Sequence, residues 1–308
     1  MLSSTRSVAM TMLVSVSLLA APSQDQGRQG MEQPPAVDSL LSLNNEGNRL
    51  REQGLCRQAV AVLLRARSAA LKELGPAHAS IATPTNNLAL AYLCLRQFAS
   101  AERHFRDALT LLYDDSLIET RASILNNLGI LLIQLSRTKE AEVTLLQALS
   151  LNQALHGSRH PKTALAISSL GVLRLQCGQY AQARDLFNQS LEILEAHLGV
   201  HANTAAALNN LGVVHLYLRD YERARQLTAR ALDMRRQLFP PGHPDVGQSL
   251  FNHAVALDRL GQRKAARTLF RQAASIESAL ESENLTGVTV DVKALRHGHL
   301  LPPLPRGN

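Results

Sequence analysis

Adjacent asparagines recur along this chain, inside stretches whose apolar residues have helical spacing. The pairs are Asn44–Asn45, Asn86–Asn87, Asn126–Asn127 and Asn209–Asn210, and Asn252 stands alone at the last equivalent place. Asparagine is a mediocre helix former, so helix propensity does not explain the recurrence. Its carboxamide has donors and an acceptor, and can bind the backbone of an extended peptide whatever that peptide's side chains are. The pairs therefore predict a peptide-binding surface or, alternatively, hydrogen bonds to the backbone of a neighbouring element.

Four of the eleven histidines stand at equivalent places, in short joins between helical stretches: His78, His160, His201 and His243. This recurrence indicates a structural role for these side chains. Two further pairings, His156 with His160 and His297 with His299, have a spacing that suits a metal ion but lack additional ligands. We therefore predict no metal site.

The three cysteines are Cys56, Cys94 and Cys177. An odd number leaves at least one thiol free, and no two of them share a short metal-ligand spacing. We interpret all three as small apolar core residues. A Cys56–Cys94 disulfide between adjacent helix pairs is the alternative.

Catalytic motifs are not found in the sequence. It contains no phosphate-binding glycine loop after a strand, no nucleophile elbow, no His-Glu-x-x-His and no isolated carboxylate pair. We therefore predict that the protein is not an enzyme and needs no cofactor.

The elements that position these residues are six copies of one helix–turn–helix unit. Each copy has a small anchor residue, and successive anchors are 40 to 42 residues apart: Gly47, Ala89, Gly129, Gly171, Gly212 and Ala254. An alanine stands twelve residues after every anchor: Ala59, Ala101, Ala141, Ala183, Ala224 and Ala266. Small residues at fixed offsets let paired helices approach closely. The pattern predicts twelve helices and no sheet in residues 40–280.

This pattern resembles the tetratricopeptide repeat, with an Asn-Leu-Gly first helix and two small residues in the second helix. The 42-residue spacing and the Gly-x-x-His-Pro join resemble the kinesin light chain branch of that family. The resemblance covers Leu40 to about Leu280, and it departs from the family pattern at Glu46, Ser168–Ser169 and Phe251. It implies an all-α, right-handed α-solenoid of six helix-turn-helix repeats. The first helices would line a concave face that binds peptides or protein partners.

The predicted groove follows from the helical wheel of each first helix. The anchor and the leucine before it face the core, whereas residues one turn earlier and one position later point together to the concave side. The predicted groove residues are Asn45, Asn87, Leu90, Asn127, Ile130, Gln134, Val172, Asn210, Val213, Tyr217 and Asn252. None of them is charged, whereas a groove that binds carboxylates needs Lys or Arg. We expect an extended peptide with apolar side chains.

The chain is basic, with a formal net charge of +7 over 308 residues. Its arginines are predicted on outward helix faces, with acidic residues between them, as at Arg223, Arg225, Arg230, Arg235 and Arg236. Charge of mixed sign favours solubility. Nucleic-acid binding would need clustered basic residues with stacking aromatics, and the sequence has neither.

The ends of the chain are predicted to lie outside the repeats. Residues 1–23 have the pattern of a signal peptide, since Arg6 precedes an apolar run over residues 8–21 that small residues follow. The run is short for a permanent membrane anchor. We predict a disordered linker over residues 24–38, the superhelix over 39–282 and a largely disordered tail over 283–308, with a short extended segment at 288–292.

Together these features predict a non-catalytic scaffold, exported to the periplasm or secreted, that binds an extended peptide or a protein partner. No nucleic-acid partner and no membrane insertion after signal cleavage are expected. The alternative is a cytosolic regulatory or nucleic-acid-associated adaptor, if the N-terminal segment is not a signal peptide.

Overall fold

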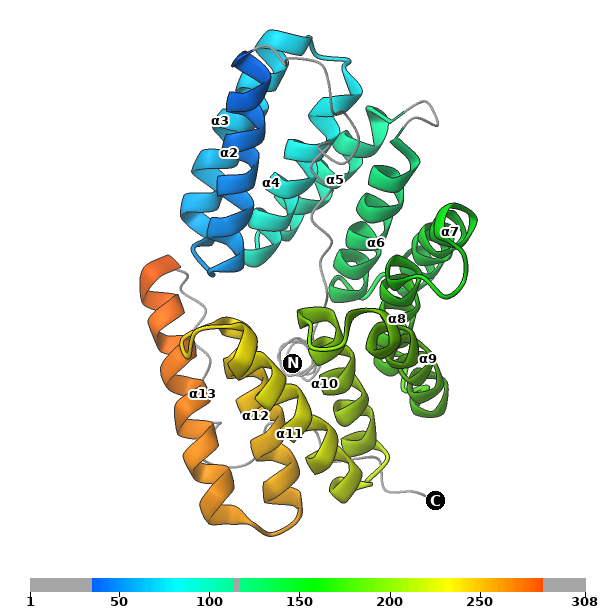
Figure 1. Cartoon of the computed structure of the whole chain (residues 1–308), viewed down its shortest axis with the longest axis vertical. Helices are drawn as coiled ribbons and strands as arrows, with labels where there is room; N and C mark the ends of the chain where they lie inside the picture. The colour runs from blue at the N-terminus through cyan, green and yellow to red at the C-terminus, as the bar shows by residue number, and fades with distance from the viewer. Residues whose placement is uncertain (1–34, 113–116, 285–308) are drawn as a thin grey trace. The chain divides into compact units, whose positions relative to one another are not determined.

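The structure, a computed structural model, describes residues 35–112 and 117–284. These residues form twelve α-helices and one short 3-10 helix, and they contain no strand (Figure 1). The first helices of the six repeats are α2 (Pro35–Glu52), α4 (Ala82–Cys94), α6 (Ile118–Gln134), α8 (Pro161–Gln176), α10 (Ala202–Tyr217) and α12 (Pro244–Arg259). The second helices are α3 (Cys56–Leu74), α5 (Phe98–Thr110), α7 (Thr138–His156), α9 (Tyr180–Leu198), α11 (Tyr221–Leu238) and α13 (Arg263–Asn284), and η1 (Ala79–Ile81) precedes α4. The predicted all-α fold of six helix pairs is confirmed.

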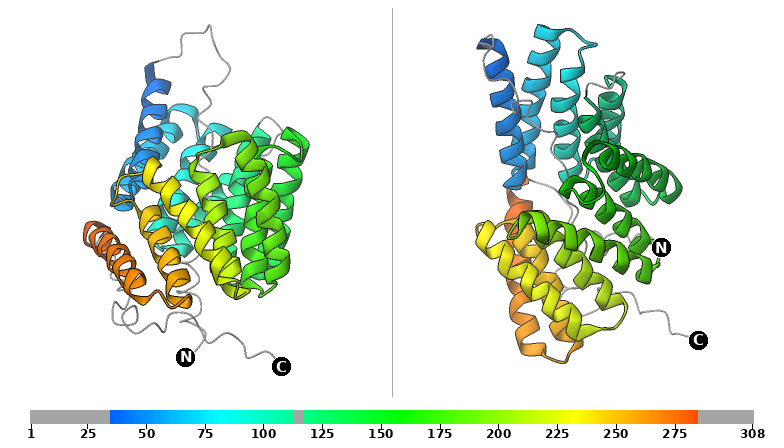
Figure 2. Two further views of the ribbon diagram at one scale, coloured as in Figure 1. Left: turned by 60° about the horizontal axis from the view of Figure 1, so that its bottom comes forward. Right: turned by 45° about the vertical axis from the view of Figure 1, so that its right-hand side comes forward.

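The helix pairs fall into two compact units, which meet in sequence between Leu155 and His156. In the unit that contains α2 to α6, each helix packs on the next one along the chain, and α2, α4 and α6 also touch in succession. The unit that contains α8 to α13 has the same pattern, with α8, α10 and α12 in succession. Figure 2 shows α10 to α13 side by side in both views. Each unit is therefore a short stack of helix pairs, as in an α-solenoid.

The anchor residues are the points of closest approach within a pair. A Cβ atom added at Gly129 would lie 2.5 Å from Cδ2 of Leu145, and one added at Gly171 would lie 2.9 Å from Cε1 of Phe187. Both contacted residues stand sixteen positions after their anchor, so one contact is repeated. The alanines twelve positions after each anchor are at most 1% exposed: Ala59, Ala101, Ala141, Ala183, Ala224 and Ala266. Small residues at these offsets therefore leave room for side chains of the paired helix.

The turn inside each pair uses one residue in the left-handed conformation, always seven positions after the anchor. These residues are Gly54 (φ 82°), Arg96 (57°), Ser136 (60°), Gly178 (76°), Arg219 (63°) and Gly261 (80°). The next residue donates its N–H to a carbonyl five positions back, as Arg137 does to Leu132 at 2.9 Å. This is the hydrogen bond of a Schellman helix end. The recurrence of one turn explains why a non-glycine residue adopts this conformation three times.

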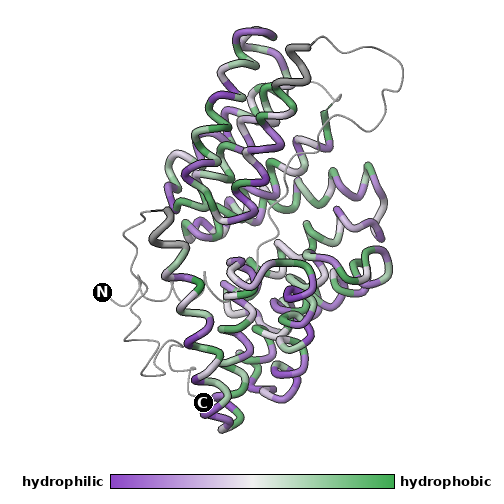
Figure 3. The backbone as a smooth tube through the Cα atoms, turned by 60° about the vertical axis from the view of Figure 1, so that its left-hand side comes forward, coloured by the Kyte–Doolittle hydropathy of each residue, from purple (hydrophilic) through white to green (hydrophobic). Residues whose placement is uncertain are grey.

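Hydrophobic and hydrophilic residues are interspersed along the helices of each unit (Figure 3). The second helix α5 is amphipathic, whereas most residues of the first helices α4 and α10 are buried. The first helix begins at Pro35, inside the predicted linker over residues 24–38, because proline suits the first turn of a helix. The last helix ends at Asn284, close to the predicted boundary at residue 282. The predicted signal peptide and the extended segment at 288–292 lie outside the described residues.

Candidate functional site

Asparagine side chains connect the first helices of the first three repeats. Nδ2 of Asn87 on α4 donates to Oδ1 of Asn44 on α2 at 2.9 Å. Nδ2 of Asn127 on α6 donates to Oδ1 of Asn86 on α4 at 3.2 Å, and Nδ2 of Asn86 donates to Oδ1 of Asn87 at 3.1 Å. All four side chains are at most 5% exposed. We call Asn44, Asn87, Asn86 and Asn127 the asparagine chain.

The second unit repeats one link of this arrangement. Nδ2 of Asn252 on α12 donates to Oδ1 of Asn209 on α10 at 2.8 Å, and both residues are buried. In all three links the donor stands two residues before its anchor, and the acceptor stands three residues before the anchor of the preceding repeat. Repeat four has serine at both places, and Ser169 donates instead to the carbonyl of Leu165 in its own helix at 3.1 Å. The hydrogen bond between neighbouring first helices therefore forms at fixed offsets of the repeat, where both positions are asparagine.

These bonds correspond to the alternative interpretation of the pairs, in which asparagine holds stacked repeats together. The alternative predicted that each asparagine bonds to the backbone of a neighbouring element. The observed partner is the side chain of another asparagine. Both atoms of the buried Asn126 amide have no hydrogen-bond partner among the residues that the structure describes. Asn87, Asn127 and Asn252 therefore have a structural role, and nothing in these contacts tests an additional role in peptide binding.

The predicted groove residues differ in exposure. Asn45 is exposed on α2, whereas Gln134 at the end of α6 and Tyr217 at the end of α10 are half-buried. The other eight are buried: Asn87, Leu90, Asn127, Ile130, Val172, Asn210, Val213 and Asn252. The structure brings Asn87 and Asn127 together through Asn86, and it does not test whether the eleven residues line one groove. That assignment stays a prediction.

Tyr217 is the predicted groove residue with the most distinct electrostatics. Its ring stacks on Tyr180 of α9, with 5.0 Å between the ring centroids. Burial, with a smaller effect of Tyr180, raises the pKa of Tyr217 to about 12. Its hydroxyl is therefore neutral at every physiological pH and remains a hydrogen-bond donor.

The four recurring histidines cap the helices that follow them. In each case Nδ1 accepts the backbone N–H two residues later: Ser80 from His78 at 3.2 Å, Lys162 from His160 at 3.2 Å, Asn203 from His201 at 3.1 Å and Asp245 from His243 at 3.2 Å. A ring nitrogen that accepts this bond must be unprotonated. The predicted structural role of these histidines is confirmed, and the caps require the neutral ring.

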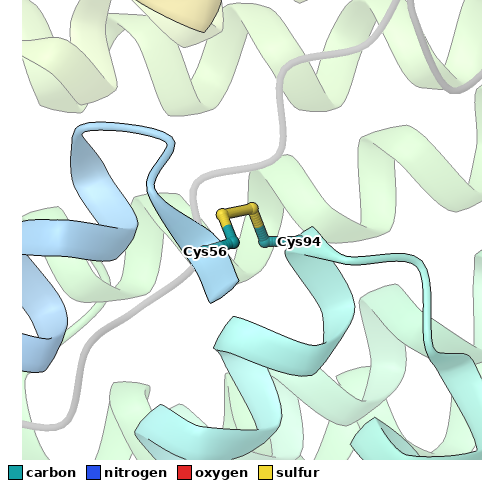
Figure 4. Close-up of a disulfide and its surroundings, with 2 residues drawn as sticks. All are labelled: Cys56 and Cys94. Carbon is teal, nitrogen blue, oxygen red and sulfur yellow. A yellow bond between two sulfur atoms is a disulfide. The ribbon is translucent and has the colours of Figure 1, made fainter. Parts of the chain in front are cut away.

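The interpretation of the cysteines as core residues was wrong. Cys56 at the start of α3 and Cys94 at the end of α4 form a disulfide, with 6.1 Å between their Cα atoms (Figure 4). Cys56 is buried, whereas Cys94 and the free Cys177 are exposed. The disulfide covalently joins repeats one and two. The spacing of the cysteines in sequence does not show that the end of one first helix meets the start of the preceding second helix.

Arg235 was also misplaced by the sequence analysis, which put it on an outward face. Its side chain is 1% exposed, and Nη1 donates to the carbonyl of Asp245 at 2.7 Å and to Oγ of Ser249 at 2.8 Å. Burial lowers the pKa of the guanidinium, with an opposing effect of Asp245. The sequence contains a signal for this burial, because other repeats have the apolar residues Leu112 and Leu194 at the same offset, 23 residues after the anchor.

Within residues 35–112 and 117–284, no three His, Cys, Asp or Glu side chains gather so that they could hold a metal ion. Across the same part of the chain, no helix is both long and apolar enough to cross a membrane.

Comparisons with known proteins agree with the repeat pattern. The family model for the tetratricopeptide repeat matches residues 38–114, 120–196 and 201–276. No curated protein sequence matches the chain. Such repeats are typical of proteins that bind other proteins and are generally non-catalytic.

Solved structures share the fold at low sequence identity. BtubC (BKLC) from P. vanneervenii is 20% identical, with a TM-score of 0.54 over 81% of this chain and 93% of that chain. A Rap protein complexed with competence and sporulation factor is 15% identical, with a TM-score of 0.58 over 80% of this chain and 79% of that chain. A putative kinesin light chain from Podosopora anserina is 20% identical, with a TM-score of 0.49 over 66% of this chain and 97% of that chain. At these identities the likeness of the first two concerns the fold alone, and the third, with its lower TM-score, carries no argument.

Proposed function

Because the chain belongs to the tetratricopeptide repeat family, we propose that it is a non-catalytic scaffold that binds an extended peptide segment of a protein partner. The observation that carries this proposal is the match of the family model to all six repeats, over residues 38–276 with two short gaps. The predicted groove residues supply uncharged amides, one phenol and aliphatic side chains. Such a surface suits a peptide with apolar side chains whose backbone is hydrogen-bonded.

Three predicted groove residues are accessible enough to contact such a peptide directly: Asn45, Gln134 and Tyr217. The amides of Asn45 and Gln134 can donate to and accept from a peptide backbone, and the neutral Tyr217 hydroxyl can donate. The buried Asn87, Asn127 and Asn252 would act on the ligand mainly by holding the first helices in place. The proposal therefore assigns direct contacts to the first group and support to the second.

Site-specific photo-crosslinking tests the groove. A photoreactive amino acid is placed at Gln134 or Tyr217 and, as a matched control, at the exposed Arg236 on the second helix α11. We expect one protein to be crosslinked from both groove positions and not from the control. Equal crosslinking from Arg236 would place the partner outside the groove.

We also propose that the chain is exported. The Cys56–Cys94 disulfide supports this, because disulfides persist in oxidising compartments and are rare in the cytosol. A fusion of residues 1–25 to a reporter that is active only outside the cytosol should give signal. Deletion of residues 8–20 should abolish that signal. A silent intact fusion would favour the cytosolic adaptor.

A further inference from the structure

The first repeat contains a cavity of about 230 Å³ near the N-terminal end of the repeats. Its walls come from the first half of α2, the second half of α3 and the beginning of the second repeat. The apolar lining consists of Leu40, Leu41, Ala66, Ala70, Leu74 and Pro84. All of these residues lie within one compact unit, so the cavity belongs to a single packed body.

The repeat pattern shows why this repeat is hollow. The residue 23 positions after the anchor is buried in each of the first five repeats: Ala70, Leu112, Asn152, Leu194 and Arg235. Four of these side chains are larger than alanine, and Arg235 reaches the next first helix, where it donates to the carbonyl of Asp245. Ala70 is the small one. Leu40 also stands where the other repeats have alanine or glycine, and it adds an apolar wall.

The lining indicates the chemistry of a ligand. None of the described residues around the cavity is Asp, Glu, Lys or Arg. Among the polar residues there, Oδ1 of Asn44 already accepts from Asn87, and Nδ1 of His78 already accepts from the N–H of Ser80. Oγ1 of Thr83 is buried without a hydrogen-bond partner among the described residues. A charged ligand would therefore lack a counter-charge, whereas an apolar ring would contact aliphatic side chains on several sides.

The volume sets the size of that ligand. An apolar cavity of about 150 Å³ in another protein binds benzene. The larger space beside Ala70 has room for a two-ring group. We propose that this cavity, which we call the Ala70 pocket, binds a small uncharged aromatic group of about the size of indole. It is a site separate from the predicted peptide groove.

Calorimetric titration with indole, on the full chain with its disulfide intact, tests the proposal. We expect saturable binding of indole to the unmodified protein. In NMR spectra recorded during the same titration, the methyl signals of Ala70 and Leu74 should shift. The variant Ala70→Leu restores the side chain found in repeats two and four, and should weaken indole binding by about tenfold or more because it occupies the ring's space. The matched control Ala61→Leu adds the same side chain to the exposed face of α3 and should leave binding unchanged.

A graded variant guards against misfolding. Ala70→Val fills less of the pocket and should weaken binding by an intermediate factor, while melting curves verify that each variant is folded. Absence of indole binding to the unmodified protein, or unchanged binding to folded Ala70→Leu, would overturn the proposal. Titration with N-acetyltryptophanamide distinguishes whether the natural ligand is a partner's side chain or a free small molecule. Binding as tight as that of indole indicates a side chain of a partner, and binding of indole alone indicates a free small molecule.

Discussion

The unit that ends at Leu155 and the unit that begins at His156 are built from the same kind of helix pair. The bonds that join successive repeats differ from one unit to the other. In the first unit, the Cys56–Cys94 disulfide and the asparagine chain join successive repeats. In the second, repeats five and six are joined by the Asn209–Asn252 bond and by the buried Arg235. The comparison indicates that small residues at fixed offsets and the asparagine link recur in both units, whereas the disulfide and the Arg235 contacts each join a single pair of repeats.

The largest expected difference between the two units comes from the disulfide. It closes a loop with a sequence separation of 38 residues, for which the chain-entropy model gives roughly 3–4 kcal/mol of stabilisation. Reduction, or the double change Cys56→Ser and Cys94→Ser, should destabilise the first unit selectively. Amide hydrogen exchange measures this, with faster exchange expected in α3 and α4 than in α10 and α11. The exposed Cys177→Ser is the control, and equal loss of protection in both units would contradict local stabilisation.

Replacing the buried alanine twelve residues after an anchor by a larger residue should destabilise both units to a similar extent. Ala141 on α7 and Ala224 on α11 occupy the same offset and are 0% exposed. Changing either one to leucine forces three extra carbons into a close helix contact, at a cost of about 1–3 kcal/mol. Thermal melts of the two variants should show similar losses, and the exposed Arg236→Ala should melt like the unmodified protein. A clear difference in the loss of melting temperature between the two variants would indicate that the close helix contact differs between the units.

The asparagine chain of the first unit should contribute a smaller effect than the disulfide or the close alanine contacts. Asn87→Ala removes one bond to Asn44 and one from Asn86, and leaves buried polar atoms unpaired. We expect a loss of roughly 1–2 kcal/mol, within the usual range for such groups. Ser169→Ala in the second unit removes only a bond within its own helix and should cost less. Urea unfolding of both variants measures the difference, and equal losses would argue against a special role of the asparagine chain.

The sequence predicted the fold well because its strongest signal is a direct consequence of packing. Glycine or alanine at each anchor, and alanine twelve residues later, are the residues that a close helix pair allows. The Cys56–Cys94 disulfide was given only as an alternative, because it depends on the meeting of two helix ends in space. The burial of Arg235 was missed because the residue type was given more weight than its offset. The asparagines were identified as unusual, but their partner side chain depends on the stagger between neighbouring first helices.

The smallest predicted effect concerns pH and the cap at His160 in the second unit. The cap needs a neutral ring, and burial, followed by the charges of His156 and His197, lowers the pKa of His160 from its ordinary value of 6.5. Above pH 6.5 the ring is neutral in the folded and unfolded chain, so the cap contributes fully. As the pH falls below 6.5, the unfolded chain binds a proton first, and stability is lost until the folded-state pKa is passed. The loss should not exceed about 1 kcal/mol, the usual value of a helix cap.

His160→Asn isolates this effect, since asparagine caps a helix without titrating in this range. The difference in unfolding free energy between pH 7.5 and pH 5 should be smaller in this variant than in the unmodified protein. If His160→Asn and the unmodified protein lose the same stability on acidification, protonation of this cap does not contribute to acid sensitivity.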